Sequence, residues 1–219
     1  MTPGDRTARP APGSAVVFDF GAVLFQWRPE ALLQRVVPEL APDPASARSF
    51  AAQIFQSFTP DSDWARFDLG LLEPDALATR IAARLKVPAA AIRAVIDAIP
   101  GHLVAQAEAV SLFRRLAAPG RRRCFLSNMP RSYADHLERE NPFIAEFDDG
   151  IFSGRVGLMK PHEAIYALAE RQFGLDPART VFIDDHAGNV EQAHTRGWQA
   201  VQYRDAAQCE AALREGGWL

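Results

Sequence analysis

Three carboxylates and one lysine stand beside apolar segments, where burying a charge is costly. Asp19 follows the run AVVF, Asp184 and Asp185 end the run TVFIDD, and Lys160 precedes a proline at the start of a helical pattern. A carboxylate in such a place needs hydrogen-bond donors or a cation. Two adjacent acids also repel each other unless a cation lies between them. These residues therefore predict a cation-binding site.

Hydroxyl and amide groups accompany these charges. Ser127 and Asn128 end a second apolar run, where they could hold a phosphoryl or carboxylate oxygen. Asn189 comes four residues after Asp185, on the first turn of the next expected helix. Because each group lies at the carboxyl end of an expected strand or just beyond it, one crevice would gather them all.

Four short apolar runs suit strands that are buried on both faces of a parallel sheet. They are Ala15–Phe20, Cys124–Ser127, Thr180–Asp184 and Gln199–Tyr203. Helical spacing of apolar residues recurs between and after them, in Gln106–Ala118, Ser132–Arg139, His162–Phe173 and Ala187–Arg196. This alternation predicts an α/β fold with a doubly wound, mainly parallel, Rossmann-like sheet.

The segment 28–101 contains no convincing strand and is too long for a loop. Helices are expected near Pro29–Val37, Ala45–Phe58, Pro74–Leu85 and Ala89–Ile99. The predicted organisation is a tail over 1–14, an α/β core over 15–27 and 102–219, and an inserted all-helical cap domain over 28–101. The tail is expected to be disordered because it is rich in Pro, Gly and Arg and has no apolar stretch.

Composition excludes several classes of partner. Twenty-four basic against 27 acidic residues give a formal net charge of −3, so no global positive field recruits nucleic acid or an acidic membrane. No apolar run is long enough to span a bilayer. Two cysteines cannot build a disulfide framework, so a cytoplasmic location is expected. A monomer and a homodimer both remain open.

The motifs together resemble those of the haloacid dehalogenase-like (HAD) hydrolase superfamily over about residues 15–205. VVFDFGAVLF resembles the first motif, FLSN the second, GLMKPHEAIY the third and FIDDHAGNVEQAHTRG the fourth. The helical insert lies where one branch of this superfamily carries a cap that encloses the substrate. FDFGAVLF, KPHEAIY and FIDDxxxNV most resemble the subgroup that contains the α-D-glucose-1-phosphate phosphatase.

The resemblance implies a Mg²⁺-dependent phosphatase for a small phosphorylated metabolite, plausibly a sugar phosphate. Asp19 would attack phosphorus and form an aspartyl-phosphate. The resemblance implies that Ser127 and the Asn128 backbone bind phosphoryl oxygens and that Lys160 neutralises charge. Mg²⁺ would be held by Asp19, Gly21, Asp184 and Asp185. Asn189 would orient Lys160 or the acidic pair. Arg66 and Asp68 of the cap are candidates for specificity.

Gly21 departs from the D-x-D pattern of most superfamily phosphatases. The second Asp of that pattern is the general acid and base, and glycine cannot transfer a proton, although its carbonyl could still contact the metal. The resembled subgroup also has Gly at this position. Either a substrate with a good leaving group or a proton carried by water or His186 would compensate.

Two other functions remain open. A 2-haloacid dehalogenase also uses an Asp nucleophile and lacks the second Asp, but it needs no metal, and Asp184 and Asp185 would repel a carboxylate substrate. A catalytically silent module that binds a phosphorylated ligand is the third possibility. The retained charges weigh against it, because buried charges are costly.

Overall fold

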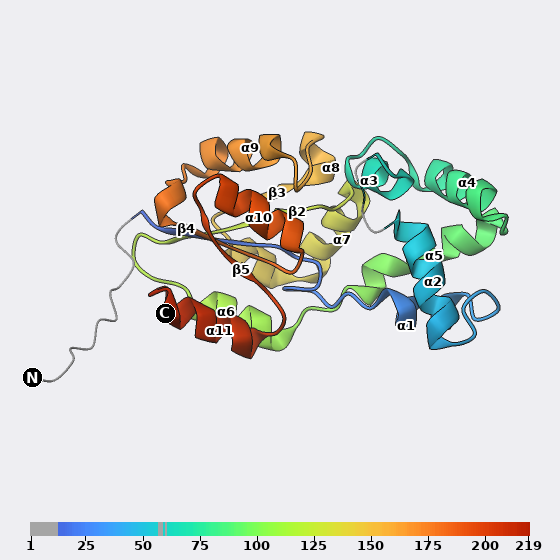
Figure 1. Ribbon diagram of the computed structural model, residues 1–219, viewed down its shortest axis with the longest axis horizontal. Helices are drawn as coiled ribbons and strands as arrows, with labels where there is room; N and C mark the ends of the chain where they lie inside the picture. Colours follow the sequence, from blue (N-terminus) through green and yellow to red (C-terminus); the bar gives the residue numbers. More distant parts are fainter. Residues whose placement is uncertain (1–12, 57–58, 60) are drawn as a thin grey trace, which may run out of the picture.

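A five-stranded parallel sheet forms the centre of the protein. Figure 1 shows the computed structural model, which describes residues 13–56, 59 and 61–219. The strands are β1 (Ala15–Phe18), β2 (Arg122–Ser127), β3 (Asp149–Phe152), β4 (Thr180–Asp184) and β5 (Gln199–Gln202), in the order β3-β2-β1-β4-β5. All neighbouring strands are parallel, which confirms the predicted doubly wound α/β fold.

The apolar runs form strands because the sheet is covered on both faces. Along β1, Val17 packs with Phe182 and Cys124 in one apolar cluster, whereas Val16 and Phe18 belong to a second cluster. This alternation is the two-residue period of a strand, with apolar side chains required on both sides.

Helices supply the two covering layers. α9 (Glu163–Phe173) and α10 (Ala187–Thr195) lie on one face, and α6 (Ala107–Arg115) and α11 (Ala206–Glu215) on the other (Figure 1). α7 (Arg131–Glu140) and α8 (Ser153–Val156) follow β2 and β3 and contact the cap helices α5 and α3 respectively. Two 3-10 turns, Pro142–Glu146 and Pro177–Arg179, lead into β3 and β4.

Five α-helices are found in the described part of the segment between β1 and the rest of the core. They are α1 (Pro29–Val36), α2 (Pro44–Phe55), α3 (Asp63–Asp68), α4 (Pro74–Leu85) and α5 (Ala89–His102), and they lie to one side of the sheet (Figure 1). Pro29 and Pro74 take the first helical positions, and Asp43 caps α2 with a reciprocal capping box. We call these five helices the cap.

Several boundaries differ from the sequence expectation. The first strand ends at Phe18, two residues before the expected end, and β2 begins at Arg122, two residues before the expected start. α5 continues to His102, one residue beyond the expected insert. β3 and α11 have no counterpart among the expected elements.

The N-terminal expectation concerns residues that lie mostly outside the described part of the chain. Residues 13 and 14 are described and already contact the core: Gly13 N–H donates to the Gly120 carbonyl, and the Ser14 carbonyl accepts from Arg122. In the described residues, no helix is both long and apolar enough to cross a membrane.

Candidate active site

Asp19 lies at the carboxyl end of the central strand. Its backbone N–H donates to the Ile183 carbonyl at 2.9 Å, which continues the pairing of β1 with β4 by one residue. The side chain is 8% exposed, and its Oδ1 is 2.8 Å from Nζ of Lys160. A buried carboxylate is therefore held beside a buried cation, on the edge of the sheet where ligands bind in this architecture.

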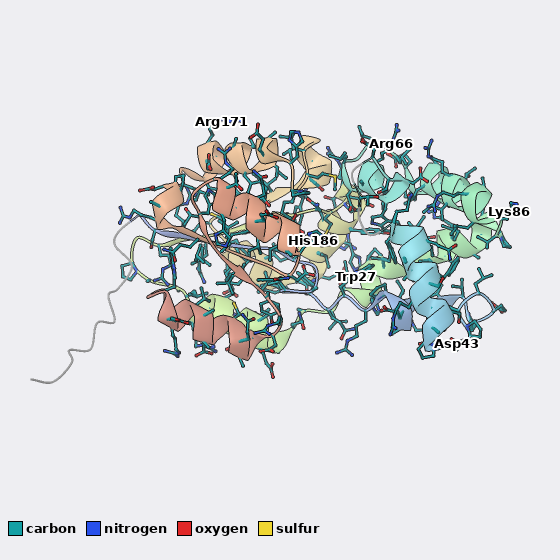
Figure 2. All side chains as sticks on the ribbon, viewed as in Figure 1. Trp27, Asp43, Arg66, Lys86, Arg171 and His186 are labelled. Atoms are coloured by element: carbon teal, nitrogen blue, oxygen red, sulfur yellow. The ribbon has the colours of Figure 1, made fainter. Side chains whose placement is uncertain are left out.

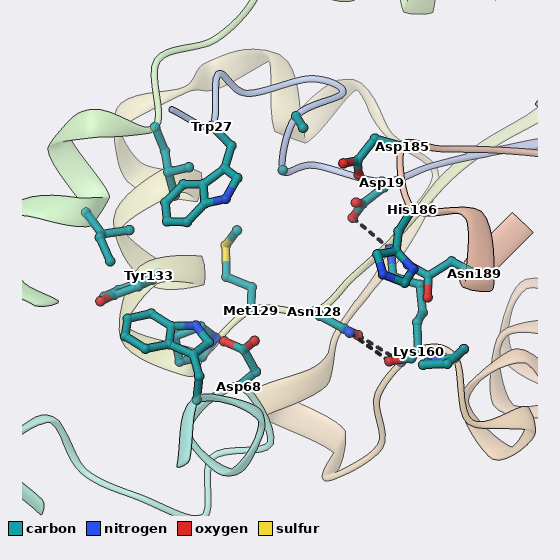
Figure 3. A pocket seen from close by; sticks show the side chains of 17 residues that line it. Asp19, Trp27, Asp68, Asn128, Met129, Tyr133, Lys160, Asp185, His186 and Asn189 are labelled. Carbon is teal, nitrogen blue, oxygen red and sulfur yellow. Dashed lines mark hydrogen bonds and ion pairs between the residues drawn. The ribbon is translucent and has the colours of Figure 1, made fainter. Parts of the chain in front are cut away.

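Lys160 connects two carboxylates. Its Nζ lies 2.6 Å from Oδ2 of Asp184 as well as next to Asp19, and the residue is 2% exposed. The Asn128 side chain fixes the lysine backbone, accepting from Lys160 N–H at 2.8 Å and donating to its carbonyl at 2.9 Å (Figure 3). Asn128, directly after β2, thus positions the ammonium group of Lys160, which neutralises Asp19 directly after β1.

Asp184 is buried completely and satisfied by donors. Besides Lys160, its carboxylate accepts from Nδ2 of Asn189 at 3.0 Å and from the backbone N–H of His186 at 2.8 Å. Asn189 is placed for this by the first turn of α10. Asp184 therefore anchors Lys160, whereas the side chain of Asp185 accepts no hydrogen bond from another described residue, and Asp185 lines the cavity.

The three carboxylates can share one ion. Asp19, Asp184 and Asp185 each offer an oxygen, and these oxygens lie within 4.8 Å of one another. One ammonium among three carboxylates leaves two negative charges uncompensated when all are ionised. Hard oxygen donors with this charge suit Mg²⁺. Gly21 lines the same cavity, close to this cluster in the chain.

Burial and mutual repulsion shape the protonation of the cluster. Burial raises the pKa of Asp19 to about 7; Lys160 opposes this rise, and the charges of Asp184 and Asp185 add to it. Burial also raises the pKa of Asp185, and the charge of Asp184 contributes. For Lys160, burial acts to lower the pKa, but the attraction of Asp184 and Asp19 outweighs it, so the pKa lies above its ordinary value. Lys160 is therefore a permanent cation.

A cavity opens from this cluster towards the cap (Figure 3). The charged end is lined by Asp19, Asn128, Lys160, Asp185, His186 and Asn189, and the other end by Trp27, Asp68, Met129 and Tyr133. The rest of the lining consists of Gly21, Ala22, Trp64, Ile99, Leu103, Pro130 and Pro161. The cavity therefore combines a charged end with a mainly apolar end.

Two residues expected to contact substrate lie apart from this cavity. Ser127, at the end of β2, is 1% exposed and is not among the lining residues, so its phosphate-binding role stays a prediction. Arg66 is exposed on the outer surface of the cap (Figure 2) and does not line the cavity either. Asp68, the other cap candidate, does line it.

Sequence reasoning missed several wall residues. Met129 and Tyr133 line the cavity, and neither carried a signal in the sequence. Tyr133 lies on α7, three residues after Pro130, where helical periodicity predicts only a buried face. Its contribution became visible only because α7 packs against α5.

Comparison with known proteins identifies a family and a relative. A family model described as haloacid dehalogenase-like hydrolase matches residues 14–194. A sesquiterpene phosphatase from Aspergillus oryzae is 28% identical over 202 residues, which cover 92% of this chain and 95% of that protein.

Solved structures share the fold. A predicted HAD-like hydrolase from Porphyromonas gingivalis has a TM-score of 0.67 and 21% identity, covering 93% of this chain and 98% of that one. The L-2-haloacid dehalogenase of Xanthobacter autotrophicus, with chloropropionic acid covalently bound, has a TM-score of 0.63 and 21% identity, covering 93% and 83%. A HAD family enzyme from Bacteroides thetaiotaomicron, in complex with magnesium and inorganic phosphate, has a TM-score of 0.64 and 20% identity, covering 87% and 94%.

The family match extends from the residue before β1 to the last helix that contributes to the site. It includes Asp19, Lys160 and the Asp184–Asp185 pair at the places where the structure brings them together. This chain is an enzyme that belongs to the haloacid dehalogenase-like hydrolases.

Proposed function

We propose that the protein is a Mg²⁺-dependent phosphatase that hydrolyses a small phosphate monoester through an aspartyl-phosphate on Asp19. The observation that carries this proposal is the charge cluster at the sheet edge. Lys160 bridges Asp19 and Asp184, and Asp185 is left free to face the cavity. The Aspergillus oryzae relative is a sesquiterpene phosphatase, which supports the same reaction class.

The first chemical step uses Asp19 as a nucleophile. One of its carboxylate oxygens forms a bond to phosphorus while the ester P–O bond breaks, and the alcohol departs after taking up a proton. In the second step water attacks the same phosphorus, which releases inorganic phosphate and restores the Asp19 carboxylate. Two easier displacements replace one difficult one.

Lys160 places a positive charge beside the nucleophile, and Asn128 holds Lys160 in position. The ammonium group lies 2.8 Å from Asp19, so positive charge is already in place where the phosphoryl oxygens would approach. Charge developing on those oxygens needs fixed cations that do not reorganise during the reaction. Asn128 holds the backbone of Lys160 through both its N–H and its carbonyl.

The residues that would hold Mg²⁺ are Asp19 and Asp185, with Asp184 close by and the Gly21 carbonyl as a further ligand. Asp184 is already occupied by Lys160, Asn189 and the His186 backbone, which favours Asp185 as the direct ligand. When bound, Mg²⁺ would supply positive charge that stabilises the negative charge of the nucleophile and of the phosphate. The Bacteroides thetaiotaomicron enzyme holds magnesium and inorganic phosphate in the same fold.

A 2-haloacid dehalogenase is the second candidate, because the Asp19–Lys160 pair and the missing second Asp would also serve that reaction. The dehalogenase neighbour shows that the fold can carry it. The negative charge at Asp184 and Asp185 argues against a carboxylate substrate, since like charges would meet at the cluster.

Phosphate release from p-nitrophenyl phosphate and from a panel of sugar and alkyl phosphates tests the proposal. Release should require Mg²⁺, stop with EDTA and be absent in Asp19→Asn, which keeps the shape of the side chain but cannot attack phosphorus. Halide release from 2-chloropropionate is measured in parallel. Halide release without any phosphate release would replace the phosphatase with the dehalogenase.

A further inference from the structure

The cap half of the cavity offers apolar surface to whatever is attached to the phosphate. Trp64 and Asp68 come from α3 and Ile99 from α5, while Met129 and Tyr133 come from the end of β2 and from α7 (Figure 3). The hydroxyl of Tyr133 donates to the Ile96 carbonyl at 2.7 Å. The one hydrogen of this hydroxyl is used within the protein, so Tyr133 has no hydrogen left to donate to a ligand, and it offers its aromatic ring to the cavity wall.

Among the described residues, Asp68 brings the one carboxyl group to this mainly apolar wall. The residue is 3% exposed, and its backbone carbonyl accepts from the Ser153 hydroxyl at 2.6 Å. Its carboxyl group, by contrast, has no hydrogen bond or ion pair with any residue in the described part of the chain. A buried polar group without a partner costs free energy. Such a group on a cavity wall has the property expected of a ligand contact.

The protonation of Asp68 decides what it can bind. Burial raises the pKa of Asp68 to about 8, and the negative charge of Asp19 across the cavity contributes to the rise. At neutral pH the group is mostly a neutral carboxylic acid, which donates one hydrogen bond and accepts others. It therefore suits a hydroxyl or carbonyl oxygen better than a cation.

We infer that the substrate is the phosphate ester of a largely apolar alcohol, and that Asp68 recognises one hydroxyl or carbonyl group on it. This inference rests on the proposed phosphatase function and names the substrate class for it. The phosphate would lie at Lys160 and the carboxylate cluster, and the organic group would extend between Trp27 and Trp64 towards the cap.

A sugar fits this wall poorly. Each sugar hydroxyl that loses water needs a new hydrogen-bond partner. The cap half offers the Asp68 carboxyl and the indole N–H groups of Trp27 and Trp64, fewer groups than a sugar has hydroxyls, whereas Ile99, Leu103 and Met129 form no hydrogen bonds of comparable strength. The sugar phosphate expected from the sequence resemblance is therefore not the substrate class that this wall favours.

Binding of non-hydrolysable phosphonates tests the apolar part without depending on turnover. With Mg²⁺ present, calorimetry compares octylphosphonate with 2,3-dihydroxypropylphosphonate. Each buried methylene is worth up to about fourfold in affinity, so octylphosphonate should bind at least about tenfold more tightly. Equal or tighter binding of the dihydroxypropyl compound would overturn the inference.

Variants of Asp68 test the recognition step. Among hydroxyoctylphosphonates with the hydroxyl at different positions, the wild type should bind at least one about tenfold more tightly than Asp68→Leu does. Plain octylphosphonate should bind Asp68→Leu as well as the wild type. Asp68→Asn, which keeps the shape and the hydrogen bonds, should retain the preference. Arg66→Gln, an exposed change in the same helix, should match the wild type.

Two outcomes distinguish a failure of this inference from a failure of the proposed phosphatase function. If no hydroxylated isomer distinguishes the wild type from Asp68→Leu, the role of Asp68 is wrong, whatever the enzyme hydrolyses. If p-nitrophenyl phosphate is not hydrolysed while octylphosphonate binds preferentially, the phosphatase function fails and the apolar site stands.

Discussion

Lys160 is one of two lysines in the chain, and its ammonium group lies where two carboxylates need a cation. Removing one partner of a buried ion pair leaves the others uncompensated, which costs about 3–5 kcal/mol. Lys160→Met should therefore lower the free energy of unfolding by about that amount and reduce kcat at least about a hundredfold. Urea denaturation and phosphate release measure the two effects.

Lys86 provides the matched control, because it is exposed at the end of α4, in the distal part of the cap (Figure 2). Lys86→Met should leave both quantities within experimental error of the wild type. A Lys160→Met protein with wild-type stability would show that the three charges do not depend on one another.

Gly21 can be tested by restoring the residue that most superfamily phosphatases have. A Cβ placed on Gly21 would meet no atom within 4 Å, and its φ is not in the left-handed region. Gly21→Asp should therefore fold. It should raise kcat at least about tenfold for an alkyl phosphate, whose alkoxide leaving group needs a proton, and much less for p-nitrophenyl phosphate.

Gly21→Ala is the control, because it fills the same space without supplying an acid. Its rates should match the wild type on both substrates. An equal gain by Gly21→Asp on both phosphates would contradict the account, since it would mean that the new carboxyl acts through charge or metal binding and not as an acid.

At the residue scale, the charged cluster and Asp68 could be predicted from the sequence, but most of the cavity wall could not. Asp19, Lys160 and the Asp184–Asp185 pair could be predicted to meet, because each follows an apolar strand or opens a helix pattern. The role of Asn128 as a clamp on the Lys160 backbone could not, because a side chain that bonds a distant peptide group leaves no pattern in the sequence.

β3 shows why one element of the sheet escaped prediction. It contains Asp149 and Gly150, which are typical of turns, before the two apolar residues that end it. Gly150 pairs with Phe125 of β2, and a Cβ on this glycine would lie 1.9 Å from the Phe125 ring. The aromatic ring lies over the glycine, so the strand depends on a contact with β2 that is remote in the sequence.

Gly150→Ala should consequently destabilise the sheet edge. The added methyl group has to displace the Phe125 ring, which costs about 1–3 kcal/mol in a packed core. Thermal unfolding should show a lower Tm than the wild type. Gly101→Ala in α5 is the control, because a Cβ there meets no atom within 4 Å. A Gly150→Ala protein as stable as the control would contradict this packing.

On the scale of the whole molecule, the cap and the core meet closely at α3 and α8. The Ser153 hydroxyl bonds the Asp68 carbonyl, and a Cβ on Gly70 would lie 2.8 Å from the Gly154 carbonyl oxygen. Gly70 also has a φ of 73°, the left-handed end expected for α3. The segment that carries Asp68 is thus held against the core, and this contact places Asp68 on the cavity wall.

Burying Asp68 on the cavity wall lowers the free energy of unfolding increasingly as the pH rises. The pKa of Asp68 is about 8 in the folded protein and about 3.9 in an unfolded chain, so between these values the folded state binds more protons. Its contribution to stability therefore falls as pH rises, by at most about 1.4 kcal/mol per pH unit. Asp68→Asn should match the wild type in Tm near pH 4 and exceed it increasingly up to about pH 8.

Scanning calorimetry across this range measures the difference. Asp61→Asn is the control: Asp61 is exposed, with a φ of 66° that asparagine also adopts. The Tm difference between Asp61→Asn and the wild type should not vary with pH in this way. A constant difference for Asp68→Asn would mean that Asp68 is not buried as an acid in the folded protein.

The measurement that tests the central claim most directly is the identity of the group that Asp19 carries during turnover. Wild-type enzyme with Mg²⁺ and a phosphate ester is quenched in acid, and the peptide that contains Asp19 is examined by mass spectrometry. The account predicts a phosphoryl group on Asp19, absent from Asp19→Asn and absent without substrate. Phosphate release with no phosphorylated Asp19, or a carbon ester on Asp19 after incubation with 2-chloropropionate, would contradict it.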